Sequence, residues 1–165
     1  MVFDRETIKS ILRRQSFWAN VPETDIDALA SISMATDFSA GSTIFREGGE
    51  NHFLYILHRG HVGLDMNVPG RGRVRILSLG PGEMLAWSAL LGDGRMTTTA
   101  TALEDTQVIS AAGGRLAELC NTNHEFGYQL MNRVAGALAK RLIATRLQLL
   151  DLFTPPTLNG GGEGS

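Results

Sequence analysis

The sequence predicts an α+β domain in which helices flank a central β-roll. Two observations indicate helices at the ends, because apolar residues recur at helical spacing in residues 4–16 and, over a longer stretch, in residues 125–153. A third observation places strands between them: residues 43–110 contain short β-branched and aromatic runs separated by glycine-rich turns. Short strands at this spacing are typical of a jelly roll or a barrel.

The chain has 165 residues, which is most simply one domain, here predicted over residues 1–153, with its own core. We expect N-terminal helices over residues 1–38, a β-roll over residues 39–112 and C-terminal helices over residues 113–153. Residues 154–165 are rich in glycine and break the helical pattern, so a disordered tail is predicted there.

The N-terminal helices follow from two apolar faces. Ile8 and Leu12 share one face of the first predicted helix. Residues 22–25 form a helix-start signal, and Ile26 and Leu29 supply the buried face of the helix that follows.

Turns rich in glycine, proline and acidic residues separate the predicted strands. In chain order these strands are residues 43–46, 53–58, 62–68, 74–79, 97–102 and 107–110. Apolar and polar residues alternate in residues 62–68, which is the pattern of a strand with one face on a core.

Two helices follow the roll, a short one over residues 115–121 and a long one over residues 125–153. The long helix has two neighbouring apolar stripes, and this face is wider than one small roll needs. We therefore expect a homodimer in which residues 125–153 pack on a second copy. Gly136 costs this helix about 1 kcal/mol relative to alanine, which a close helix contact would justify.

Composition excludes several classes of function. The formal net charge is -2 with no basic stripe, so the footprint of a nucleic-acid-binding protein is missing. A single cysteine, Cys120, excludes an internal disulfide and a cysteine-rich metal site. The N-terminus has no apolar signal-peptide core, and no run approaches the roughly 18 apolar residues of a membrane span. We expect a cytoplasmic protein without a membrane partner.

The most informative stretch is residues 79–105, LGPGEMLAWSALLGDGRMTTTATALED. Its residue types predict a strand end, a glycine-proline turn, one short helical turn, a second glycine turn and a threonine-rich strand. This layout presents backbone N–H groups at a helix N-terminus, where an anion such as a phosphate is favoured.

Four motifs stand in a fixed order along the chain. They are GSTIFREGG at residues 41–49, YILHRGHV at residues 55–62, LGPGE at residues 79–83 and ALED at residues 102–105. Together they resemble the cyclic-nucleotide-binding domain of the catabolite-activator superfamily, and the resemblance extends over roughly residues 16–153.

The resemblance implies an eight-stranded β-roll, a long dimerisation helix and a cyclic nucleotide, cyclic AMP or cyclic GMP, held inside the roll. The phosphate would lie on the amides of residues 86–89. The site residues that the resemblance implies are Leu85, Ala86, Trp87, Ser88, Ala89, Arg95, Thr97, Thr98 and Thr145. Direct DNA binding is not expected, because the winged helix-turn-helix of the transcription regulators would have to follow the long helix.

The segment departs from the family at its acidic residue. The glycine–glutamate pair that holds the ribose 2′-hydroxyl in family members is here Ala86-Trp87. An indole N–H only donates, so Trp87 cannot accept a hydrogen bond from a sugar hydroxyl. Trp87 either fills the cavity as a core residue or stacks on a base.

The phosphate-binding arginine of the family is also displaced. Counting back from Ala102 puts Met96 at the expected position and Arg95 one residue earlier. A one-residue slip on a strand turns a side chain to the other face. Because Arg95 follows Gly94, a loop that absorbs the difference would still deliver a bidentate phosphate contact. The alternative is a solvated turn arginine.

The hydroxyl residues of the implied site each have two interpretations. Ser88 either caps the short helix or donates to a phosphate oxygen. Thr97 and Thr98 either reach a phosphate or simply favour a strand. Thr145 matches the position from which family members touch the purine, and its hydroxyl alternatively bonds back to a helix carbonyl.

Two functions remain in competition. The first is a sensor of a small phosphorylated molecule that signals through the long helix to an effector protein of unknown identity. The second is a ligand-free dimeric interaction module whose cavity is filled by Trp87 and Met96. An enzyme is not expected, because the four histidines lack metal-site spacing and the sequence shows no nucleophile–base pair.

Overall fold

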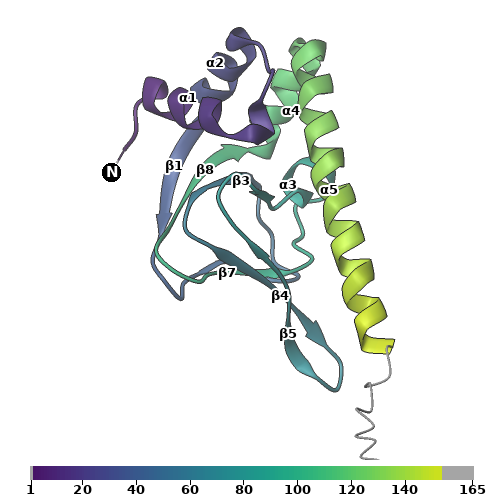
Figure 1. The fold of residues 1–165 in the computed structure, drawn as a ribbon. Coiled ribbons are helices and arrows are strands. Elements are labelled where there is room, and N and C mark those ends of the chain that lie inside the picture. The colour runs from purple at the N-terminus through teal and green to yellow at the C-terminus, as the bar shows by residue number, and fades with distance from the viewer. Residues whose placement is uncertain (1, 154–165) are drawn as a thin grey trace, which may run out of the picture.

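The computed structural model describes residues 2–153 and confirms the α+β roll (Figure 1). The helices are α1 (Arg5–Arg14), the 3-10 turn η1 (Ser16–Trp18), α2 (Glu23–Ser31), α3 (Ser88–Leu91), α4 (Gly113–Thr122) and α5 (His124–Phe153). The strands are β1 (Ser33–Phe38), β2 (Thr43–Phe45), β3 (Phe53–Arg59), β4 (Val62–Val68), β5 (Gly72–Leu79), β6 (Met84–Leu85), β7 (Thr99–Ala102) and β8 (Thr106–Ala112). The predicted tail, residues 154–165, lies outside the described residues.

The strands form two antiparallel sheets. Sheet A has the order β1-β8-β3-β6, and sheet B has the order β2-β7-β4-β5. Strand β8 lies between β1 and β3, so that Ser110 is opposite Met34 on one side and Tyr55 on the other. Figure 1 shows α1 and α2 covering one end of the roll, while α5 runs along its side.

Strand β1 lies where the sequence predicted the end of the N-terminal helical segment, so the predicted helices through residue 38 are wrong at residues 33–38. This strand is at the edge of sheet A, where its partner is β8. Polar contacts hold the pair: the Thr36 and Ser110 hydroxyl oxygens are 3.2 Å apart, and the Gln107 amide donates to the Asp37 carboxylate at 2.8 Å. An edge strand of this kind lacks the apolar alternation from which strands are predicted.

Two apolar clusters lie on opposite faces of sheet A. The inner cluster, between the two sheets, consists of Phe45, Tyr55, Leu57, Val62, Leu64, Leu79, Leu85, Ala86, Met96, Ala100 and Val108. The outer cluster, beneath the helices, consists of Ile8, Ile11, Leu12, Trp18, Val21, Ile26, Leu29, Ala30, Leu54, Ile56, Met84, Ile109, Ala111, Leu116, Phe126, Leu130 and Val134. Along β3, Leu54 and Ile56 therefore face the helices, whereas Leu57 faces the roll interior.

Helix α5 is buried in its first half and exposed in its second. Phe126, Leu130 and Val134 are almost fully buried in the outer cluster. The exposed apolar face of α5 consists of Leu142, Ile143, Leu147, Leu149 and Leu150, which are 52–62% exposed. Among the described residues, no helix is long and apolar enough to cross a membrane.

The cassette segment, residues 79–105, touches the helices through Gly113, the first residue of α4. A Cβ atom at Gly113 would lie 2.0 Å from the carbonyl oxygen of Ala89, which belongs to α3. The Gly113 N–H also donates to the His52 carbonyl at 2.8 Å. The absence of a side chain at Gly113 therefore allows direct backbone contact between the cassette segment and α4.

The two neighbouring glycines of α4 form a matched test of this contact. We expect Gly113→Ala to lower the free energy of unfolding by about 1–3 kcal/mol, because backbone must move to relieve the overlap. We expect Gly114→Ala, whose Cβ meets no atom within 4 Å, to raise it by about 0.5–1 kcal/mol. Urea denaturation of both variants measures this, and equal stabilities would contradict the contact.

Candidate functional site

The cassette segment has the predicted path, built on backbone hydrogen bonds. Strand β6 leads into Ala86 and the single turn α3. The Ala86 carbonyl accepts from the Ala89 N–H at 3.1 Å, and the Trp87 carbonyl accepts from the Leu90 N–H at 3.0 Å. The Gly94 N–H donates to the Ser88 carbonyl at 3.1 Å, which closes the second turn.

Residues 94–96 of the cassette segment pair with the turn between β2 and β3. The Asn51 N–H donates to the Gly94 carbonyl at 2.8 Å, and the Gly48 N–H donates to the Met96 carbonyl at 2.7 Å. The Met96 N–H in turn donates to the Gly49 carbonyl at 2.9 Å. These bonds fix the direction of the side chains of residues 95 and 96.

Ala86 has a left-handed backbone conformation, with φ of +68°. Its methyl group is buried in the inner cluster, with 6% of the residue exposed. A left-handed conformation costs a residue with a Cβ atom roughly 1–2 kcal/mol. The left-handed turn is therefore made by a residue with a side chain, at the position where the resemblance implies glycine.

Trp87 packs against the outer cluster, beneath the helices, and does not fill the roll interior. It is half-buried. The left-handed turn at Ala86 separates the two environments, because Ala86 faces the inner cluster and Trp87 the outer one. Trp87 therefore does not fill the roll interior but packs as a core residue against the outer cluster, where it links the cassette segment to the helical layer. Stacking of Trp87 on a base stays a prediction.

Arg95 and Met96 point in opposite directions, as the one-residue slip predicts. Met96 is 4% exposed and belongs to the inner cluster. Arg95 is exposed, and its guanidinium donates to the Gly48 carbonyl at 3.4 Å. The inward position thus carries a thioether, whereas the guanidinium of Arg95 lies at the surface.

The remaining predicted site residues are spread between interior and surface. Leu85 and Ser88 are buried, Ala89 and Thr98 are half-buried, and Thr97 is exposed. No side-chain hydrogen bond caps α3, and its N-cap residue is Trp87, so the predicted capping role of Ser88 is wrong.

Thr145 lies on the second half of α5 and is half-buried. Its hydroxyl donates to the Arg141 and Leu142 carbonyls, each at 3.0 Å, so the back-bonding interpretation describes its state in this structure. The predicted contact with a purine stays a prediction.

A polar pair that sequence reasoning missed borders the roll interior. The Tyr55 hydroxyl donates to the Asn51 side-chain carbonyl at 2.9 Å, and the Asn51 amide lies 3.9 Å from the Met96 sulfur. The Tyr55 ring stacks on Phe45 with centroids 6.4 Å apart, and burial raises the pKa of Tyr55. The alternation of residues 53–57 would have placed Tyr55 inside, whereas the loop residue Asn51 gave no signal.

The described part of the chain contains no group of three or more His, Cys, Asp or Glu side chains that could hold a metal ion. Cys120 is half-buried, and burial raises the pKa of its thiol, which favours the unreactive protonated form.

Two buried alanines of the inner cluster test the strain at Ala86. Truncating a buried alanine to glycine normally costs about 1.5–2 kcal/mol, from the lost methyl group and the more flexible unfolded chain. We expect Ala100→Gly to show this loss, and Ala86→Gly to stay within about 1 kcal/mol of the parent, because glycine relieves the left-handed strain. Thermal and urea unfolding measure both, and equal losses would contradict strain at Ala86.

Comparisons with known proteins connect these features to a family. The family described as the cyclic nucleotide-binding domain matches residues 35–123. The chain is 30% identical over 144 residues to the CRP-like cAMP-activated global transcriptional regulator of Mycobacterium tuberculosis. That alignment covers 87% of this chain and 62% of the regulator, so the chain spans less than two thirds of the relative's length.

Solved structures agree with this relationship. A putative cyclic nucleotide-binding protein from Geobacter metallireducens is 28% identical with a TM-score of 0.71, and the match covers 85% of this chain and 98% of that one. A cyclic nucleotide-binding domain from Methylobacillus flagellatus has a TM-score of 0.78 at 19% identity, over 93% and 86% of the two chains, and shows a shared fold. With its two-sheet roll, its cassette segment and the match over residues 35–123, the chain belongs to the cyclic nucleotide-binding domain family.

Proposed function

We propose that this chain is a regulatory domain that senses a small phosphorylated molecule and passes the change through α5 to a partner protein. The observation that carries the proposal is the position of the cassette segment between the roll interior and the helices. Ala86 and Met96 belong to the inner cluster, Trp87 packs under the helices, and α3 touches the start of α4. A ligand that moves this segment would therefore move the helical layer as well.

Cyclic AMP and cyclic GMP are the first candidate ligands. In support, a relative that is 30% identical is a cAMP-activated regulator. In this proposal the amides of residues 86–89 and the side chains of Arg95, Thr97 and Thr98 receive the phosphate. Arg95 would first have to leave the Gly48 carbonyl.

Recognition of the sugar and phosphate is proposed to differ from that in family members with the usual charged pair. Trp87 supplies no carboxylate for the ribose 2′-hydroxyl, and Met96 supplies no guanidinium for the phosphate. A phosphate that enters the roll without a cation loses its hydration and gains little in return. We therefore expect weak binding or a changed preference among nucleotides.

We further propose that the output of the domain is a homodimer formed through α5. The exposed apolar face of α5 would be the contact between the two copies. Helix packing of this kind has discrete alternative arrangements, so it is suited to transmit a two-state signal. In this proposal the protein binds ligands and does not catalyse a reaction. It makes no direct contact with DNA, and it acts in the cytoplasm.

One observation favours a second candidate function, a ligand-free interaction module. Met96 occupies the inward position and belongs to the inner cluster, while Arg95 is exposed. In this alternative the roll is a stable core, and only the exposed surfaces act. The cassette segment would then serve to hold α4 and α5 in place.

Thermal unfolding with millimolar cyclic AMP, cyclic GMP, cyclic dinucleotides and ordinary nucleotides tests the sensor. A ligand at 100 times its dissociation constant stabilises the fold by about 2.7 kcal/mol. For a domain of this size, we expect a rise in Tm of roughly 5–10 °C. The shift should disappear in Arg95→Ala and persist in Arg71→Ala, a control arginine at the exposed tip of the β4–β5 hairpin.

No change in Tm with any of these nucleotides would contradict the sensor and leave the interaction module as the better account. A shift that survives Arg95→Ala would keep the sensor and remove Arg95 from the phosphate site.

A further inference from the structure

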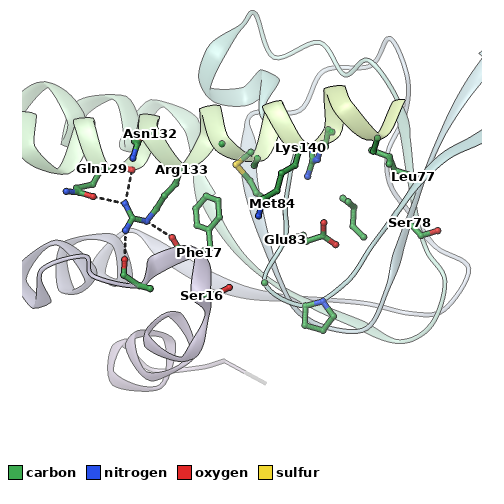
Figure 2. A pocket seen from close by; sticks show the side chains of 18 of the residues that line it. Ser16, Phe17, Leu77, Ser78, Glu83, Met84, Gln129, Asn132, Arg133 and Lys140 are labelled. Carbon is green, nitrogen blue, oxygen red and sulfur yellow. Dashed lines mark hydrogen bonds between the residues drawn. The ribbon is translucent and has the colours of Figure 1, made fainter. Parts of the chain in front are cut away.

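A cleft with a volume of about 820 Å³ lies between α5, the 3-10 turn η1 and the turn that joins β5 to β6 (Figure 2). It shares Leu79 and residues 81–84 with the start of the cassette segment, but it is lined by none of the residues from 85 to 98, which are the ones proposed to receive the phosphate. Its volume is within the range of small-molecule sites, about 300–1,000 Å³.

Small residues on α5 keep the cleft open. Gly136, Ala137 and Ala144 line it, and a Cβ atom at Gly136 would meet no other atom within 4 Å. Glycine in the interior of a helix costs about 1 kcal/mol relative to alanine. Among the described residues, no element packs against Gly136 to explain this cost.

One end of the cleft is fixed by Arg133, whose guanidinium makes four hydrogen bonds. Figure 2 shows it joined to the N-terminal segment, because it donates to the carbonyls of Phe17 and Ala19. It also donates to the Gln129 backbone carbonyl at 3.2 Å and to the Gln129 side-chain oxygen at 2.6 Å. These bonds tie α5 to the N-terminal segment and engage most of the donors of Arg133.

The other cations of the cleft, Lys140 and Arg141, have donors to spare. Within residues 2–153, neither side chain makes a hydrogen bond or an ion pair. Arg141 is half-buried, and burial lowers the pKa of its guanidinium while the charge of Glu83 opposes the change. A guanidinium has five N–H donors, and withdrawing them from water without acceptors is costly.

The acidic side chain of the cleft does not neutralise both cations. The Glu83 carboxylate accepts from the Gly80 N–H at 2.7 Å and so belongs to the β5–β6 turn. The end of the cleft opposite Arg133 contains two cationic side chains, Lys140 and Arg141, and one anionic side chain, Glu83, so its net charge is positive. Phe17, Leu77 and Ala137 give the remaining wall an apolar character.

We propose that this cleft binds a small amphipathic organic anion, whose phosphate, sulfonate or carboxylate group is held by Arg141 and Lys140 and whose apolar body lies against Phe17 and Leu77. The inference goes beyond the proposed function, because the site lies outside the roll and stands whether or not the roll takes up a nucleotide. A ligand here would contact α5 and the β5–β6 turn together, and so would fix the position of the helix.

The probe is 8-anilinonaphthalene-1-sulfonate, which combines an apolar ring system with one anionic group. We expect a saturable rise in its fluorescence with one site per chain. Arg141→Gln should weaken binding about tenfold, since a charge-assisted hydrogen bond is lost. Gly136→Leu, which fills the cleft at a position with free space around it, should abolish binding with an unchanged circular dichroism spectrum.

Two control variants on α5 separate the cleft from the rest of the helix surface. Arg146→Gln removes an exposed cation that does not line the cleft, and Tyr128→Gln removes an exposed aromatic side chain that lies neither in the cleft nor in the proposed dimer contact. Both should bind the dye like the parent. Loss of binding in Tyr128→Gln, or equal affinity of Arg141→Gln and the parent, would overturn the proposal.

The result is independent of the nucleotide test. Arg95→Ala should leave dye binding unchanged, because Arg95 does not line the cleft. A failure of the cleft would therefore appear as an absent effect of Arg141→Gln, whereas a failure of the sensor would appear as an absent change in Tm with nucleotides.

Discussion

Strands β3 and β8 of sheet A are buried on both faces, and the rest of the structure depends on this constraint. Alternate residues of these two strands supply the roll interior and the helical core, so the two clusters share the same backbone. Each large apolar side chain that is fully buried in this way contributes roughly 1.5–3 kcal/mol. The cassette segment is attached to the same sheet through β6, and it therefore inherits a fixed position between the two cores.

The cassette segment follows the path that its motifs predict, with side chains that differ from those the resemblance implies at two positions. Its path is held by main-chain hydrogen bonds and by the contact with Gly113, which do not depend on charge. Met96 at the inward position avoids the desolvation cost of a buried guanidinium. The left-handed alanine at residue 86 has an energetic cost that glycine would avoid.

Much of the fold could be predicted from sequence, because periodicity and glycine turns report local structure. Strand β1 was missed because polar cross-strand bonds rather than apolar alternation hold it, and β6 is only a residue pair, Met84–Leu85. The opposite directions of Arg95 and Met96 followed from register. The surroundings of Trp87 could not be predicted, since they depend on the backbone turn at Ala86. The cleft could not be predicted from the sequence either, because α5 and the β5–β6 turn, which line it, are far apart along the chain.

Helix α5 is the proposed output of the domain, with its exposed apolar face as the contact between two copies. Sedimentation equilibrium of the parent, of Leu147→Glu and of Leu103→Glu tests this directly, because both leucines are exposed, at 58% and 43%. We expect a dimer for the parent and for Leu103→Glu, and a folded monomer for Leu147→Glu. A monomeric parent, or a dimer that survives Leu147→Glu unchanged, would contradict it.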